Sequence, residues 1–133
     1  MKVFIRLKST VSSPEAENDT ITHQGTGMLT HSGALLRVSF PLSGIMQTLV
    51  YDPKEPHRLE LWRGGDRLYF DTAVSFAEGR YCIEGITLFP KIQTHSLEGS
   101  LTEKGGKVLI DYTLTLETEI QHFHMEIEVN AIS

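Results

Sequence analysis

Apolar and polar residues alternate along most of this chain, and the alternation predicts β-strands. The clearest segment is Val108–Leu116, with polar residues such as Asp111 on its second face. The first face carries Val108, Ile110, Tyr112, Leu114 and Leu116. A period of two turns successive side chains to opposite faces of a sheet. About eight to ten segments share this pattern, so the chain is predicted to be almost entirely β-structure.

Turn residues separate these segments and set their boundaries. Gly64-Gly65-Asp66 and Gly105-Gly106 are predicted hairpin turns, because such turns need positive φ. Gly25 and Gly27 lie inside a predicted strand and indicate a bulge or a tight bend. The remaining extended segments are predicted at residues 3–11, 20–30, 34–40, 45–51, 58–63, 67–72, 80–89 and 91–103.

The segment Glu119–Val129 fits two interpretations. Leu116, Ile120, Phe123 and Ile127 have helical spacing, whereas Phe123, Met125, Ile127 and Val129 have strand spacing. We predict a strand, because β-branched residues occupy the inward positions and no helix cap precedes them. Short connections between consecutive strands then favour an antiparallel meander.

These elements predict one all-β domain over residues 1–133, a closed antiparallel up-and-down β-barrel of about 8–10 strands. Closure is expected because it removes exposed strand edges. The residues predicted to point inward are Ile5, Leu7, Leu36, Val38, Phe40, Leu59, Leu61, Leu68, Phe70, Ile110, Tyr112 and Leu114. A packed core and an internal cavity are both compatible with this set.

Composition and charge narrow the functional classes. The net charge of −5 disfavours a surface that follows nucleic-acid phosphates. No apolar run approaches the ~20 residues of a membrane helix, and residues 1–8 lack a signal-peptide pattern, so we expect a cytoplasmic protein. Cys82 is the single cysteine, which excludes an internal disulfide and a cysteine-based zinc cluster. We expect it to be a small buried residue.

Two hairpins carry a resemblance to a known family. The segment Leu101-Thr102-Glu103-Lys104-Gly105-Gly106-Lys107, with Ile110, Tyr112 and Leu114 beyond it, resembles the C-terminal hairpin of the YwiB-like proteins. These are small bacterial calycin-like β-barrels of unknown function. Trp62-Arg63-Gly64-Gly65 is similar to their Arg-x-Gly turn, and Phe76, Gly79, Tyr81 and Gly85 match their later spacing.

The resemblance extends from about Gln47 to Val129 and departs at the Pro-rich loop Asp52–His57. It implies a bacterial β-barrel of the calycin or lipocalin type, and it brings no catalytic residues and no cofactor. Nor does the sequence contain a Gly-x-Ser-x-Gly elbow. We therefore predict no catalytic set and expect a protein that is not an enzyme.

Our first functional hypothesis is a protein that binds a small apolar or amphipathic ligand in the barrel. Aliphatic inward residues would bury the body of the ligand. Its polar end would be fixed by candidate residues near a barrel mouth, namely Arg63, Tyr112, Trp62 and Arg37. Surface positions for the two arginines, and a packing role for Trp62, are the alternatives.

The second hypothesis is a metal-dependent enzyme built on His122 and His124. On a strand these two side chains share one face with Glu126 and Glu128. A solvent-exposed polar face explains the same row without a metal, and a third ligand such as His95 or His31 would be needed. A third hypothesis is an interaction protein, such as a homodimer, that uses a strand edge or the loop around Pro53 and Pro56.

Overall fold

The computed structural model describes residues 1–14 and 16–132, with only the backbone of residues 16 and 17. Within these residues it contains strands and turns and no helix, so it offers no helix that could span a membrane. The strands are β1 (Lys2–Ser13), β2 (Ala16–Ser32), β3 (Leu35–Leu42), β4 (Ile45–Tyr51), β5 (Arg58–Arg63), β6 (Asp66–Asp71), β7 (Ala77–Glu78), β8 (Tyr81–Ile83), β9 (Ile86–Leu88), β10 (Lys91–Thr102), β11 (Gly105–Leu116) and β12 (Glu119–Ala131).

One antiparallel sheet of ten strands forms the body of the protein, in the order β6-β5-β4-β3-β2-β1-β12-β11-β10-β7. The first and last long strands pair from Val3 opposite Ala131 to Ser12 opposite His122. Strands β8 and β9 form a separate small hairpin. The predicted antiparallel barrel is confirmed as a sheet that is nearly closed, and residues 119–129 lie in a strand as predicted.

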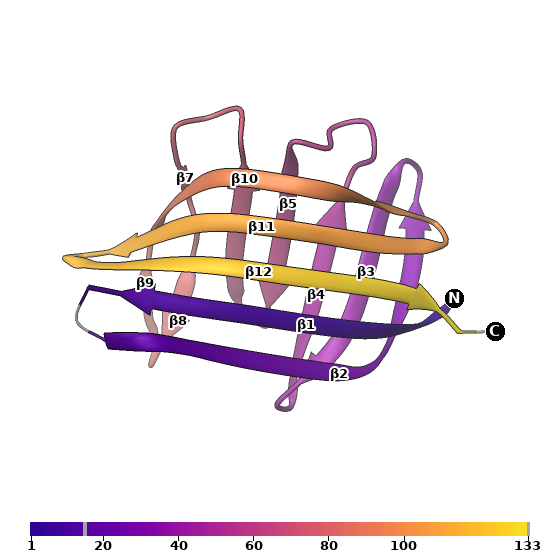
Figure 1. Ribbon diagram of the computed structural model, residues 1–133, viewed down its shortest axis with the longest axis horizontal. Coiled ribbons are helices and arrows are strands. Elements are labelled where there is room, and N and C mark those ends of the chain that lie inside the picture. The colour runs from indigo at the N-terminus through magenta and orange to yellow at the C-terminus, as the bar shows by residue number, and fades with distance from the viewer. Residues whose placement is uncertain (15, 133) are drawn as a thin grey trace.

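The sheet folds over itself in two layers. In Figure 1, β1, β2 and β10–β12 lie side by side in one layer, and β3–β6 cross behind them. Strand β2 serves both layers, since it pairs with β1 up to Met28 and with β3 from Met28 onward. At this corner a Cβ on Gly27 would lie 2.4 Å from the Ser39 carbonyl oxygen. Glycine is therefore required for the close approach of two strands at the predicted bend.

The second corner closes the barrel between β6 and β10. A bulge at His95 shifts the register between β10 and β11, and β10 then packs beside β6. The backbone amide of Asp71 donates a hydrogen bond to Thr94 Oγ1 at 3.1 Å. Arg67 and Arg80 exchange two backbone hydrogen bonds of 2.8 Å. These bonds hold the seam where the sheet is not continuously paired.

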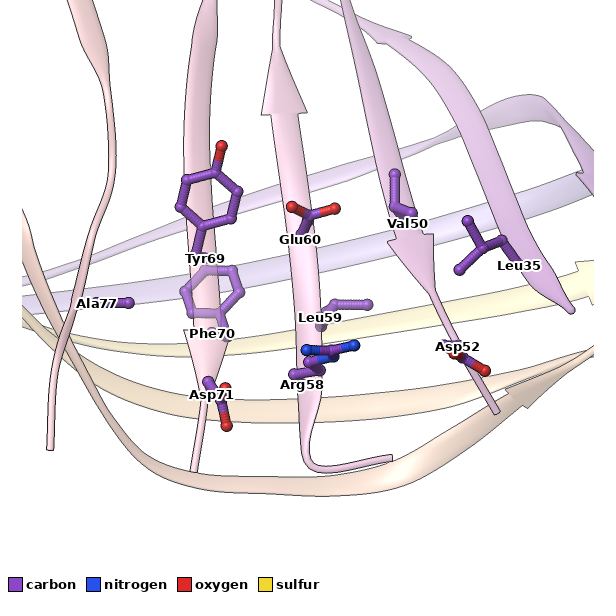
Figure 2. Close-up of a pocket in the computed structure, with 10 residues that line it drawn as sticks. All are labelled: Leu35, Val50, Asp52, Arg58, Leu59, Glu60, Tyr69, Phe70, Asp71 and Ala77. Atoms are coloured by element: carbon purple, nitrogen blue, oxygen red, sulfur yellow. The ribbon is translucent and has the colours of Figure 1, made fainter. Parts of the chain in front are cut away.

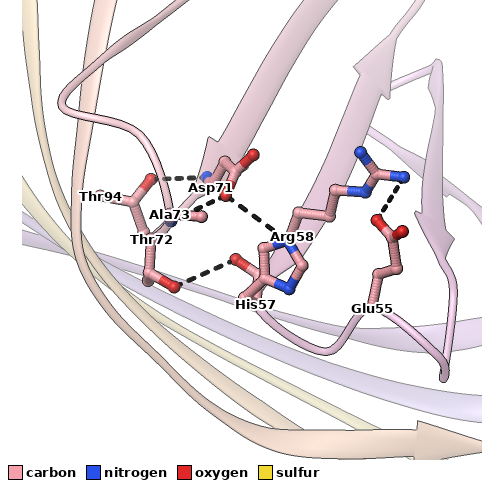
Figure 3. A network of polar contacts seen from close by, with 7 residues as sticks. All are labelled: Glu55, His57, Arg58, Asp71, Thr72, Ala73 and Thr94. Carbon is pink, nitrogen blue, oxygen red and sulfur yellow. Dashed lines mark hydrogen bonds and ion pairs between the residues drawn. The ribbon is translucent and has the colours of Figure 1, made fainter.

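Figure 3 shows the polar contacts where the C-terminal end of β6 meets this seam. Asp71 Oδ1 accepts a hydrogen bond from the Ala73 amide at 2.9 Å and lies 3.9 Å from His57 Nε2. The Thr72 amide donates to the His57 carbonyl oxygen at 3.0 Å. Together with the Thr94 bond, these contacts tie the end of β6 to the loop before β5 and to β10.

Side chains from both layers fill the interior. All twelve residues predicted to point inward are buried, and they belong to one apolar cluster. The Phe70 and Tyr112 rings lie 4.6 Å apart between centroids, and Tyr112 stacks on Phe123 at 4.9 Å. This arrangement favours the packed core over the internal cavity.

Two local predictions are wrong. The turn between β10 and β11 is at Glu103–Lys104, and Gly105-Gly106 belongs to β11. A Cβ on Gly105, where φ is +110°, would lie 2.2 Å from the Val129 carbonyl oxygen, so the glycine serves a close strand approach. Cys82 is exposed, because it lies in the small β8–β9 hairpin outside the barrel wall.

Candidate functional site

A groove of about 370 Å³ lies on the outer face of the barrel wall, over β3–β6 and beside β7. Val50, Glu60 and Tyr69 are cross-strand neighbours on β4, β5 and β6. Figure 2 shows these side chains in a row with Leu35 of β3. Val50 is only 6% exposed although it points away from the core, so the groove has an apolar floor.

The polar side chains that line the groove are mostly acidic. The charged ones are Asp52, Arg58, Glu60 and Asp71, three carboxylates against one guanidinium. Arg58 forms an ion pair with Glu55, and Asp71 binds the Ala73 amide. Asp52 accepts a hydrogen bond from the Lys54 amide at 2.9 Å. Among the described residues, the Glu60 carboxylate has no hydrogen bond or ion pair, so it is free to bind a ligand.

The four residues predicted to bind a ligand lie on opposite sides of the barrel wall. Tyr112 is buried inside, and Arg63 is close enough for its charge to act on the Tyr112 phenol. Burial raises the pKa of Tyr112 strongly, and Arg63 partly offsets this effect. Trp62, the residue before Arg63 on β5, points to the outer face, where Arg37 of β3 also lies. The four therefore do not form one site.

Trp62 is occupied by neighbours of its own chain. The Arg67 guanidinium lies 4.5 Å from the ring centroid and that of Arg37 lies 5.4 Å away. Both are cation–π contacts, which the π-electron density of an indole favours. Arg67 also donates hydrogen bonds to the Gly64 and Asp66 carbonyl oxygens. The outer face of β5 is thus organised around Trp62, with two arginines covering it.

The predicted histidine pair lies on a different part of the surface. His122 and His124 project from β12 toward Asp111 of β11, which is on the outer face as the alternation predicted. His122 Nε2 lies 2.9 Å from Asp111 Oδ1, and His124 Nδ1 lies 3.6 Å from Asp111 Oδ2. The other nitrogen of His124 lies 3.9 Å from Glu126 Oε1. One carboxylate therefore bridges the two imidazoles.

His95 joins this cluster from β10, whereas His31 lies elsewhere, paired with Leu36 on β3. The bulge sets His95 and Ser96 against the single residue Asp111. His95 Nε2 lies 2.7 Å from Thr113 Oγ1, and its ring stacks on that of His122 with centroids 5.6 Å apart. Ligand atoms of His95, Asp111 and His122 all lie within 4.8 Å of one another.

The sequence contained signals for the groove that alternation alone misses. Leu35-Leu36 and Leu49-Val50-Tyr51 are consecutive apolar residues, so they place apolar side chains on both faces of the sheet. Those on the outer face, Leu35 and Val50, form the apolar part of the groove. Tyr69 had no distinguishing signal, since only the register of β5 and β6 sets it beside Glu60.

Comparison with known proteins supports the fold. No protein-family model matches the sequence, and no curated protein matches it. The crystal structure of the YwiB protein from Bacillus subtilis is similar, with a TM-score of 0.78 over 98% of this chain and 92% of that one. The two sequences are 15% identical, and at this level the likeness shows the fold alone. The YwiB-like fold that the two hairpins predicted is confirmed.

Proposed function

We propose that this protein binds a small amphipathic cation, such as an amine with an apolar body, in the outer groove over β3–β6. The observation that carries the proposal is the free Glu60 carboxylate, which lies between Val50 and Tyr69 in the cross-strand row. Our hypothesis from the sequence placed a ligand inside the barrel. Because buried apolar side chains fill the interior, we propose a site on the outer face of the same wall instead.

Shape and charge define the ligand class. A volume of about 370 Å³ is in the range of small-molecule sites, which combine apolar walls with a few polar groups. Val50 and Leu35 would contact the apolar body, and the Tyr69 ring would lie against it. The ammonium group would pair with Glu60, and Asp52 and Asp71 add negative potential at the end of the groove. The three carboxylates would repel an anionic ligand.

Two probes of equal chain length and opposite charge test this proposal. We expect octylamine, which is protonated at neutral pH, to shift the backbone amide NMR signals of Val50, Glu60 and Tyr69 in a saturable way. Octanoate should cause no comparable shift, because the acidic groups repel it. Saturable shifts with octanoate, or none with octylamine, would overturn the proposal.

A matched pair of variants locates the binding. Glu60→Gln keeps the shape of the side chain and removes its charge, and we expect octylamine affinity to fall about tenfold or more, as for a charged hydrogen bond. Glu98→Gln makes the same change at an exposed position on β10 that does not line the groove, and it should leave the affinity unchanged. Equal losses in both variants would indicate a general charge effect and contradict a site at Glu60.

A further inference from the structure

We propose that His95, Asp111 and His122 form a binding site for one divalent transition-metal ion on the outer face of β10–β12. The proposal is independent of the groove, which lies over β3–β6 and shares no lining residue with it. The sequence predicted the pair His122 and His124 and left the further ligands open. The structure places Asp111 and His95 beside this pair, and the proposal specifies His95, Asp111 and His122 as the ligand set.

The three side chains converge because of the strand register. Thr113 pairs with His122 and Asp111 pairs with His124, so Asp111 lies diagonally beside His122. The bulge in β10 then supplies His95 next to the same two strands. Bulges commonly redirect a side chain at functional positions. Three neighbouring strands thus each contribute one potential ligand.

The distances suit a single ion after small side-chain movements. With metal–nitrogen bonds near 2.0 Å, two ligand atoms of a tetrahedral ion lie about 3.3 Å apart. His122 Nε2 and Asp111 Oδ1 are already 2.9 Å apart, and all three ligand atoms lie within 4.8 Å of one another. The side chains of His122 and Asp111 are 46% and 31% exposed, so they can rotate without disturbing the core.

A second layer of contacts supports these ligands. Thr113 Oγ1 lies 2.7 Å from His95 Nε2 and 3.4 Å from His122 Nδ1, between the two imidazoles. A hydrogen bond at Nδ1 of His122 leaves its Nε2, the nitrogen beside Asp111, to bind the ion. His124 Nδ1 lies 3.6 Å from the second Asp111 oxygen and acts as a positioning residue for the carboxylate.

The donor set selects the class of metal. Two imidazoles and one carboxylate suit Zn²⁺, Ni²⁺ and Cu²⁺, whereas Mg²⁺ and Ca²⁺ prefer sites made only of oxygen ligands. The carboxylate and two neutral imidazoles carry a charge of −1, which offsets part of the charge of the ion. Three protein ligands leave one tetrahedral position for water, as in zinc sites that remain open to solvent.

A calorimetric titration of the full chain with Zn²⁺ tests the proposal. We expect one saturable site, and we expect Mg²⁺ to give none. Co²⁺ should bind to the same site, produce a visible d–d absorption band and be displaced by Zn²⁺. His95→Ala, Asp111→Asn and His122→Ala should each weaken Zn²⁺ binding by about tenfold or more.

His31→Ala is the matched control, because it removes an exposed histidine of β2 outside the cluster. It should leave Zn²⁺ affinity unchanged. Absence of Zn²⁺ binding by the unmodified protein would overturn the proposal and would show that the cluster is only a set of surface hydrogen bonds. Equal losses in His31→Ala and His122→Ala would also overturn it. Urea unfolding of each variant verifies that it is folded, and His122→Gln provides a second, more conservative removal of the imidazole.

Discussion

The rings of Phe70 and Tyr112 meet inside the barrel with their planes tilted by 56° and their centroids 4.6 Å apart. Phe70 comes from β6 and Tyr112 from β11, so the contact joins the two layers that cross in Figure 1. Both side chains are almost fully buried. The pair fills the interior between the two layers.

Truncation of Tyr112 should therefore be costly. Tyr112→Ala removes a buried ring that packs on Phe70 and Phe123, and we expect a loss of about 3–5 kcal/mol in the free energy of unfolding. Tyr112→Phe keeps the ring and should cost far less. Tyr69→Ala, on the outer face of β6, is the control and should cost less than Tyr112→Ala. Urea unfolding measures all three, and equal losses at residues 69 and 112 would contradict a packed interior.

Alkaline pH should destabilise the protein through the same tyrosine. Burial raises the pKa of Tyr112 above its ordinary value of 10, and the positive charge of Arg63 only partly counteracts this. Above pH 10 the phenol ionises in the unfolded chain and stays protonated in the folded one. The unfolded state then binds fewer protons, so stability falls as the pH rises.

The expected slope is about 1 kcal/mol per pH unit above pH 10 from this residue. Urea unfolding between pH 8 and pH 11 measures it, and Tyr112→Phe should have a shallower decline. Some decline should remain in that variant, because burial also raises the pKa values of Tyr51 and Tyr81. Identical pH profiles for the variant and the unmodified protein would contradict the prediction.

Gly27→Ala should destabilise the corner of β2. The added methyl group would meet the Ser39 carbonyl oxygen at 2.4 Å and the Ile5 side chain at 2.7 Å. Backbone of β3 would have to move, and we expect a cost of about 1–3 kcal/mol or more in unfolding free energy. Gly25→Ala is the matched control on the same strand, since its methyl group would meet only the His23 ring, at 3.3 Å. A larger loss of unfolding free energy in Gly25→Ala than in Gly27→Ala would contradict the close strand approach at Gly27.

The seam depends on a hydrogen bond from the Asp71 amide to Thr94 Oγ1. Thr94→Val conserves shape and leaves the amide without its acceptor, so we expect a loss of about 1–2 kcal/mol in unfolding free energy. Hydrogen exchange at the Asp71 amide should accelerate at the same time. Thr87→Val, at an exposed position on β9, is the control and should change neither quantity. Unchanged protection of the Asp71 amide in Thr94→Val would refute the seam contact.

Much of the candidate chemistry was visible in the sequence, and its assembly was not. Period-two alternation predicted that Asp111, His122 and His124 point away from the core, because it specifies the face of each residue on a strand. It did not predict that His95 joins them, because a bulge inserts one residue and changes the register locally. Likewise, Trp62 and Arg63 looked like neighbours in one site, yet consecutive strand residues lie on opposite sides of the wall.

The sequence by itself determined the strands, their order along a meander and the inward-facing residues, because these follow from local periodicity and short connections. Gly25 and Gly27 also indicated a bend in β2. Only the tertiary structure decided how β6 meets β10 and which outer side chains become neighbours. The physical reason is that contacts between distant strands depend on register and on close backbone approach. Gly27 permits the close backbone approach at one corner, and the bulge at His95 shifts the register at the other. Neither effect can be read from the alternation of residues.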